Sequence, residues 1–117
     1  MTKKTGGLIV FGGYQTLWTI VMFDLPTDSI RARRQYTLFR KFLLKDGYEM
    51  MQYSIYYRHH ASEENALVHS QRIKDHLPPD GEVRVMKITD KQFGRIEIFF
   101  GKLSRPVENP PEQLEFF

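Results

Sequence analysis

One carboxylate, Asp24, ends an apolar run over residues 17–23 and is followed by a proline at position 26. Apolar residues in both alternating sets predict a strand over 17–24 that is buried on both faces of its sheet. The strand would carry Asp24 at its C-terminal end, where the carboxylate oxygens suit a divalent metal ion. Asp24 is therefore a candidate metal ligand and catalytic residue. An ordinary turn, in which the carboxylate accepts backbone hydrogen bonds, fits the same residues.

A group of cations follows the proline turn. Apolar residues at helical spacing predict a helix from an N-cap at Thr27 or Asp28 to about Lys45. The other side of this helix carries six cations: Arg31, Arg33, Arg34, Arg40, Lys41 and Lys45. Such a run is commonly a solvated helix face, yet the same cations can neutralise nucleic-acid phosphates without reading base sequence. The candidate nucleic-acid contacts are Arg31, Arg33, Arg34 and Lys41.

The histidines do not form a metal-binding pattern. His59 and His60 are adjacent, and because adjacent residues of an extended chain point to opposite sides, they cannot easily bind one ion together. His69 and His76 lie two helical turns apart, too far for a pair of ligands on one helix. The chain has no cysteine, which excludes disulfides, thiolate zinc sites and cysteine nucleophiles. We expect all four histidines to be structural or to lie at the surface.

Composition bounds the class of protein. The 117 residues suffice for one domain, and 41% hydrophobic and 26% charged residues are ordinary for a globular protein. The net charge of +3 is compatible with nucleic-acid binding without being diagnostic of it. The apolar run 8–11 is too short for a secretory signal, and no run approaches a membrane span of about 20 residues. We expect a cytoplasmic protein that does not enter membranes.

The remaining chain predicts an α+β fold. A strand over 48–58 with high aromatic content precedes a helix capped by Ser62, and strands over 82–89 and 95–100 complete the set. We assign the ferredoxin-like order β-α-β-β-α-β, with two helices on one face of a four-stranded antiparallel sheet. The domain would span 15–104.

Both ends are expected to lie outside this domain. Residues 1–14 would form a flexible extension, because glycines flank their short apolar run. Residues 105–117 would form a tail for dimer or partner docking, which can add an edge strand to a sheet. The sheet face without helices would carry Met, Tyr and Trp residues, and an exposed apolar face of that size predicts a two-fold homodimer.

Four segments, in this order along the chain, resemble a known family. They are Val21-Met-Phe-Asp24-Leu-Pro26-Thr-Asp28, Phe39-Arg-Lys-Phe-Leu-Leu-Lys-Asp-Gly47, Met51-Gln-Tyr-Ser54-Ile-Tyr56 and Val85-Met-Lys-Ile-Thr-Asp-Lys-Gln-Phe93. Over about residues 17–104 the chain closely resembles the CRISPR-associated protein two family, in the branch found beside type II systems. Members of this family form the small subunit of the spacer-acquisition integrase in CRISPR antiviral defence and are called CRISPR-associated endoribonucleases.

The resemblance implies a homodimer that bridges two dimers of the larger integrase subunit and holds double-stranded pre-spacer DNA. It also implies metal-dependent cleavage of RNA or DNA, in which Asp24 of each protomer binds one shared magnesium ion, with manganese as the alternative. The family's phosphate-contacting arginines correspond to Arg31, Arg33 and Arg34. The extension 1–14 is longer than is usual in the family, and the tail is too variable for a residue-by-residue alignment.

Two other functions remain open at this stage. One is a stand-alone metal-dependent endoribonuclease of the toxin-like type, and the other is an RNA-binding ferredoxin-like module. The aromatic strand over 48–58 could stack bases, but it lacks the glycine-and-aromatic signature of RNA-recognition sheets.

Overall fold

The computed structural model describes residues 16–103, so the predicted extension 1–14 and tail 105–117 lie outside the described residues. The elements are β1 (Leu17–Asp24), α1 (Ile30–Lys45), β2 (Glu49–Gln52), β3 (Ile55–His60), α2 (Glu63–Asp75), β4 (Glu82–Thr89) and the short α3 (Asp90–Phe93). Each helix among these residues falls short of the length and apolar content that crossing a bilayer requires.

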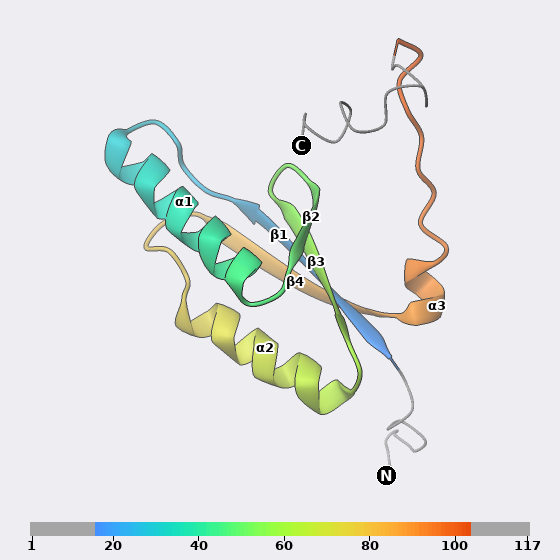
Figure 1. Ribbon diagram of the computed structural model, residues 1–117. Coiled ribbons are helices and arrows are strands. Elements are labelled where there is room, and N and C mark those ends of the chain that lie inside the picture. The colour runs from blue at the N-terminus through green and yellow to red at the C-terminus, as the bar shows by residue number, and fades with distance from the viewer. Residues whose placement is uncertain (1–15, 104–117) are drawn as a thin grey trace.

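The sheet has four antiparallel strands in the order β2-β3-β1-β4. The strand β1 lies inside the sheet between β3 and β4, as its apolar character on both faces predicts. Figure 1 shows α1 and α2 on the same face of this sheet. The fold is therefore the predicted α+β, ferredoxin-like arrangement.

The prediction of a single strand over 48–58 is wrong, because this region forms a hairpin of two strands. The strands β2 and β3 pair with each other, and Ser54 between them has a φ of 64°. This turn changes the faces on which the aromatic residues lie, so that Tyr53 is 79% exposed while Tyr56 is 1% exposed in the core. The hairpin supplies the second and third strands, in sequence, of the β-α-β-β-α-β order.

The strand predicted over 95–100 is absent from the sheet. The chain leaves β4 through α3, and residues 95–103, here called the arm, run away from the body of the molecule in Figure 1. The arm exposes large apolar side chains, including Ile98, Phe99 and Phe100 at 73%, 83% and 76%. The last strand of the fold is β4, which occupies an edge of the sheet.

The helix ends follow their capping residues. The N-cap of α1 is Ser29, whose Oγ accepts a hydrogen bond from Ala32 N at 3.0 Å, and not Thr27 or Asp28 as predicted. Ser62 caps α2 as predicted and accepts from Asn65 N at 3.1 Å. At the other end of α1, Gly47 adopts a φ of 95°, which a residue with a Cβ takes at a cost in free energy.

The core lies between the sheet and the two helices. Val21 and Phe23 of β1 are buried together with Phe39 and Leu43 of α1 and Ile73 of α2. Burying side chains of this size contributes roughly 1.5–3 kcal/mol each. Since side chains alternate along a strand, this row leaves the other row of β1, Trp18, Ile20, Met22 and Asp24, on the face away from the helices.

Candidate metal and nucleic-acid-binding site

Asp24 is the last residue of β1, and it is exposed. Its neighbour across the sheet is Glu82, the first residue of β4. Both residues line a shallow hollow of about 160 Å³ together with Met22, Phe23 and Arg84. The strand end thus places one carboxylate, a second carboxylate and a guanidinium in the same small depression.

The charges around Asp24 are only partly compensated within one chain. Arg84 Nη2 lies 3.2 Å from Glu82 Oε1, whereas no ion pair between described residues involves Asp24. Two carboxylates directly opposite each other in a sheet repel. A cation bound beside Asp24 would relieve this repulsion.

The backbone at Asp24 is held by a neighbouring turn. Gly81, with a φ of 94°, lies so close that an added Cβ would be 2.6 Å from the carbonyl oxygen of Asp24 and 3.0 Å from Leu25 Cα. On the other side, Phe23 N donates a hydrogen bond of 3.1 Å to Ser54 O in the β2–β3 turn. The backbone at Phe23 and Asp24 is therefore held by contacts from two connections.

The donor atoms at this strand end suit a hard cation. Asp24 and Glu82 offer carboxylate oxygens, which Mg²⁺ prefers, and Mg²⁺ commonly takes one or two carboxylates with waters completing its octahedron. Among residues 16–103, no group of three or more His, Asp or Glu side chains could hold a metal ion. The residues fit Mg²⁺ in kind, but one chain offers fewer ligands than a closed protein site.

The cations of α1 form a separate surface. The helix has no acidic residue, and Arg34 and Lys41 are both exposed. They are seven positions apart, which is nearly two turns, so they lie on the same side of the helix about 10 Å apart along its axis. This solvent-facing side of α1 is positive along most of its length.

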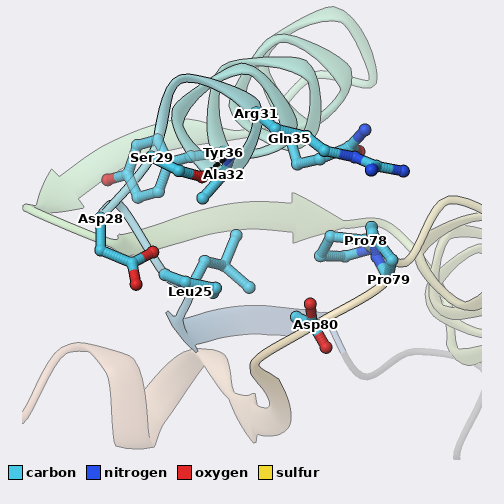
Figure 2. Close-up of a pocket in the computed structure, with 11 residues that line it drawn as sticks. Leu25, Asp28, Ser29, Arg31, Ala32, Gln35, Tyr36, Pro78, Pro79 and Asp80 are labelled. Atoms are coloured by element: carbon cyan, nitrogen blue, oxygen red, sulfur yellow. Dashed lines mark hydrogen bonds between the residues drawn. The ribbon is translucent and has the colours of Figure 1, made fainter.

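Two of the predicted contacts also have roles within the chain. Arg33 Nη1 donates to Thr27 O at 3.1 Å and so ties the helix to the loop that enters it. Arg31 lines a hollow of about 260 Å³ between the start of α1 and the α2–β4 connection, with Asp28 and Asp80 on its other sides (Figure 2). Arg33 has further donors free for a phosphate, since a guanidinium carries five N–H groups.

The structure does not bring Asp24 together with the arginines that follow it in sequence. Phe23 packs against Phe39 of α1, with ring centroids 5.2 Å apart, so its neighbour Asp24 faces away from that helix. None of the α1 cations lines the hollow of Asp24, and the cation found there is Arg84 of β4. Arg84 and Glu82 were not identified from the sequence, because they come 60 and 58 residues after Asp24 and follow no local pattern.

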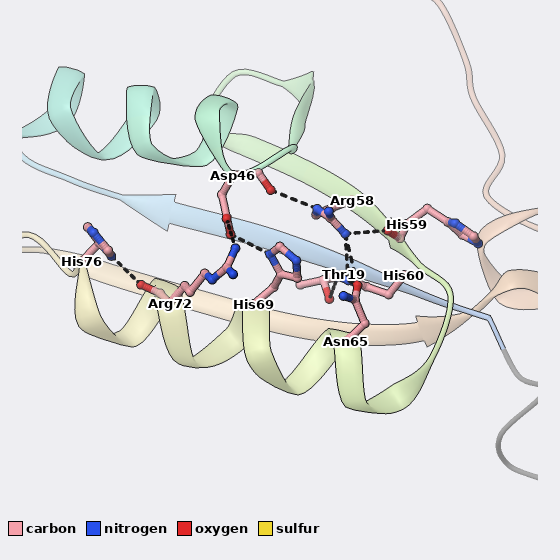
Figure 3. A network of polar contacts seen from close by, with 9 residues as sticks. All are labelled: Thr19, Asp46, Arg58, His59, His60, Asn65, His69, Arg72 and His76. Atoms are coloured by element: carbon pink, nitrogen blue, oxygen red, sulfur yellow. Dashed lines mark hydrogen bonds and ion pairs between the residues drawn. The ribbon is translucent and has the colours of Figure 1, made fainter.

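Two of the four histidines, His60 and His69, are buried and belong to a polar network (Figure 3), whereas His59 and His76 are exposed. His69 Nδ1 lies 2.7 Å from Asp46 Oδ2, and Arg72 Nη1 donates to Asp46 Oδ1 at 2.7 Å. His60 lies between Thr19 Oγ1 and Asn65 Oδ1, each 2.9 Å from a ring nitrogen. These contacts join α2 to the end of α1 and to the sheet.

The network shifts two pKa values. Burial lowers the pKa of His60, against the opposing effect of its hydrogen bond with Asn65. Burial alone would raise the pKa of Asp46, but its hydrogen bonds with His69 and Arg72 outweigh burial and lower it. The sequence gives no sign of this network, since the partners of Asp46 on α2 lie 23 and 26 residues away from it.

Comparison with known proteins agrees with the resemblance seen in the sequence. The family model described as CRISPR associated protein Cas2 matches residues 17–96. A protein named CRISPR-associated endoribonuclease Cas2 from Parvibaculum lavamentivorans is 54% identical over 101 residues, covering 86% of this chain and 100% of that relative. A protein of the same name from Flavobacterium psychrophilum is 51% identical over 104 residues, covering 89% of this chain and 90% of that relative.

A solved structure described as "Crystal structure of cas2" is 17% identical, covers 79% of this chain and 97% of that chain, and gives a TM-score of 0.46. The family match covers all the strands of the sheet, both long helices and Asp24. The chain therefore belongs to the Cas2 family of CRISPR-associated proteins.

Proposed function

We propose that this chain is the small subunit of a CRISPR spacer-acquisition complex. As a homodimer it holds incoming double-stranded DNA and bridges dimers of the larger integrase subunit, and at Asp24 it supports magnesium-dependent cleavage of RNA or DNA. Membership of the Cas2 family supports the CRISPR role. The observation that carries the holding role is the positive side of α1, which has six cations and no carboxylate.

The α1 surface suits contact with phosphates rather than with bases. Long flexible cations on a helix side neutralise the backbone, and they release counterions that favour binding to any sequence. A subunit that holds pre-spacers of unrelated sequence needs such a contact. A homodimer presents this surface twice.

The exposed arm supports the homodimer. In the β2-β3-β1-β4 order β4 is an edge strand, so one side of its backbone is free to pair. The arm carries the exposed apolar residues Ile96, Ile98 and Phe100 in one alternating row, which would be partly buried if the arm paired with a strand edge. The arm of one copy on the β4 edge of the other, and the reverse, gives a closed two-fold pair.

Asp24 of each copy would hold the metal ion. The exposed oxygen donors at the strand end support this role, as does the incomplete ligand set within one chain. Bound Mg²⁺, or Mn²⁺ in its place, would supply charge stabilisation at phosphoryl oxygens and a more acidic water. Asp24 itself binds the ion and fixes its position at the end of β1, and Arg84 lies within reach of an anionic group in the same hollow.

The test replaces Asp24 by asparagine, which keeps the size of the side chain and removes its charge. Asp28→Asn is the matched control, because Asp28 is exposed, lies nearby in sequence and lines a different hollow. We expect D24N to abolish Mg²⁺-dependent cleavage of RNA and DNA, and to leave duplex-DNA binding and spacer integration with the larger subunit intact. D28N should retain all three.

The same experiment tests a second candidate, a stand-alone endoribonuclease, which the name of the similar proteins favours. In that case the protein cleaves RNA without the larger subunit, and it neither binds duplex DNA nor supports integration. Cleavage that survives D24N refutes the role of Asp24. Failure of the wild-type protein to bind duplex DNA refutes the holding function.

A further inference from the structure

A hollow of about 360 Å³ lies at the β2–β3 side of the sheet, and none of the roles proposed above uses it. It forms beyond the end of β2, which begins at Glu49 opposite Tyr57, so that no strand among residues 16–103 flanks the last residues of β3. Its size is within the range of small-ligand sites, about 300–1,000 Å³. The residues that line it are Trp18, Gly47, Glu49, Tyr57, Arg58 and His59. Three aromatic rings, one carboxylate and one guanidinium thus meet around one space.

The aromatic rings form one wall of this hollow. Tyr57 and His59 lie on β3, two positions apart and in the row opposite to the buried Tyr56, so both rings point to the helix-free face of the sheet. Trp18 lies opposite His59 on β1, and their ring centroids are 4.8 Å apart. Aromatic side chains grouped in this way bind planar ligands such as nucleobases by stacking.

Contacts with α3 hold the Trp18 ring in place. Its indole N–H donates to Asp90 Oδ1 at 2.7 Å. Its ring stacks on Phe93, with centroids 3.8 Å apart and an angle of 5° between the planes. Asp90 N also donates to Thr16 O at 3.2 Å, which ties α3 to the start of β1. This part of the wall is therefore ordered before a ligand binds, which lowers the entropy cost of binding.

Glu49 places a carboxylate beside the rings. It lies opposite Tyr57 in the sheet, and Tyr57 Oη donates to Glu49 Oε1 at 3.1 Å. Burial, and after it the hydrogen bond with Glu49, raises the pKa of Tyr57, so the hydroxyl stays protonated and continues to donate. A carboxylate has about four lone-pair sites. Glu49 can therefore accept further N–H groups from a ligand that lies on the rings.

Arg58 brings a donor to the same hollow. Its Nε donates to Asp46 O and its Nη1 to His59 O, each at 3.0 Å (Figure 3). These bonds hold the guanidinium, and no hydrogen bond between described residues uses Nη2. Gly47 leaves room beside the guanidinium, since an added Cβ would lie 2.8 Å from Arg58 Nε. Arg58 Nη2 can therefore meet an anionic group such as a phosphate.

We propose that this hollow is a nucleotide site that takes an unpaired guanine. The base lies against the rings of Tyr57 and His59 and turns its pairing edge to Glu49. Guanine fits best because that edge carries two adjacent N–H donors, which match the two oxygens of a carboxylate, whereas adenine, cytosine and uracil each offer a single donor group there. The phosphate of the nucleotide meets Arg58 Nη2. In a duplex this edge is already paired, so the guanine comes from a single strand or from a free nucleotide.

This site goes beyond the function proposed above. The α1 surface neutralises phosphates of any sequence, whereas the hollow distinguishes one base. The hollow lies on the opposite side of the sheet from the β4 edge that the proposed homodimer uses. Trp18 and Asp24 are six positions apart on β1, which is about 20 Å along an extended strand. Guanine binding therefore requires neither Mg²⁺ nor a bound duplex, and it can be tested separately from both.

The test uses the fluorescence of Trp18, which is the only tryptophan of the chain. The full-length protein is titrated with GMP, AMP, CMP and UMP in the presence of EDTA at constant neutral pH, and calorimetry measures the same affinities independently. Glu49→Gln keeps the size of the side chain and removes its charge. Its matched control is Glu64→Gln, because Glu64 is exposed on α2 and does not line the hollow. His59→Ala removes one exposed ring of the wall.

We expect GMP to change the fluorescence saturably, with one site per chain, and to bind about tenfold or more tightly than the other three nucleotides. E49Q should weaken GMP about tenfold or more and abolish this preference, because hydrogen bonds to a charged acceptor are lost. H59A should weaken all four nucleotides about fivefold, since stacking does not depend on the identity of the base. E64Q should bind as the wild type does.

Thymidine pentanucleotides with and without a central guanosine identify the source of the base. If the guanosine strand binds more tightly than GMP, the site takes single strands; if GMP alone binds, it takes a free nucleotide, and either result supports the guanine site. The proposal is overturned if neither GMP nor the guanosine strand binds saturably. It is also overturned if the four nucleotides bind equally to the wild type, or if E49Q binds GMP as tightly as the wild type does. A protein that binds guanine but neither holds duplex DNA nor cleaves with Mg²⁺ would refute the proposed function and leave this site standing.

Discussion

Replacing Arg34 and Lys41 with alanine removes two cations from the solvent-facing side of α1. Both side chains are exposed, and neither takes part in an ion pair between described residues. Alanine favours helix, and both positions lie inside the helix, so its stability should not fall. The change therefore isolates charge from folding. If α1 lies along a duplex, its two positions, about 10 Å apart, span about three phosphate steps of one strand.

The expected effect appears in the salt dependence of binding. Each phosphate neutralised contributes about −0.9 to the slope of log K against log salt concentration. A homodimer that uses both α1 surfaces loses four contacts in R34A/K41A, so its slope should become shallower by about 3.6. Between 50 and 200 mM salt, the wild-type affinity should then fall about 150-fold more than that of the variant. If only one α1 surface touches DNA, the change in slope is about 1.8.

Fluorescence anisotropy with a labelled duplex, measured at several KCl concentrations, gives these slopes. The control, K74A/K91A, makes the same change in net charge on exposed residues of α2 and α3. A slope that is equal for the wild type and R34A/K41A would show that α1 does not contact phosphate. An equal loss of slope in the control would show that net charge, rather than this helix side, drives binding.

Two further predictions concern stability. Gly81→Ala should lower the free energy of unfolding in urea by roughly 1–3 kcal/mol, because Gly81 has a φ of 94° and the new Cβ would lie 2.6 Å from the Asp24 carbonyl oxygen. The control is Gly94→Ala, which should be neutral because Gly94 has a φ of −67°. An equal loss of stability in the two variants would contradict this reasoning. Stability should also fall on mild acidification. The pKa of His60 is lowered from 6.5, so below pH 6.5 and down to that lowered pKa the unfolded chain binds more protons than the folded one. The stabilisation is complete above pH 6.5 and is lost as pH falls through this window, so urea denaturation of His60→Gln should show a smaller slope against pH there than wild type. The pKa of Asp46 is lowered from 3.8, so stability should fall a second time as the pH drops below 3.8. If stability does not fall in this range, the role given to His69 and Arg72 is contradicted.

The sequence predicted those parts of the fold that local periodicity determines. The strand over 17–24 and the helix to Lys45 have strong patterns, and both lie where they were expected. The hairpin within 48–58 was not predicted, because its turn depends on a positive φ at Ser54, which is uncommon for a residue other than glycine. The strand predicted over 95–100 is absent for a different reason. Its alternation does describe a strand, but pairing requires a neighbour, and α3 directs the chain away from the one available.

Of the candidate site, only Asp24 could be proposed from the sequence. Asp24 stands out because a carboxylate ends an apolar strand. Its companions Glu82 and Arg84 are brought there by the register of β4 against β1, and register depends on the whole sheet rather than on any short stretch. The same holds for Asp46, whose partners on α2 depend on how two helices pack on the sheet.

The placement of Asp24 changes how holding and cleavage relate to each other. In the sequence, the carboxylate and the arginines are neighbours, which suggests a single site for metal and phosphate. In the fold, Phe23 turns toward α1 and Asp24 turns to the opposite face of the sheet, so a duplex lying along α1 of one chain does not place its phosphates at Asp24 of that chain. The two proposed roles, holding and cleavage, would therefore use different surfaces. This separation is why D24N is expected to spare DNA binding, and why Arg84, rather than an α1 arginine, is the cation that would meet a phosphate at Asp24.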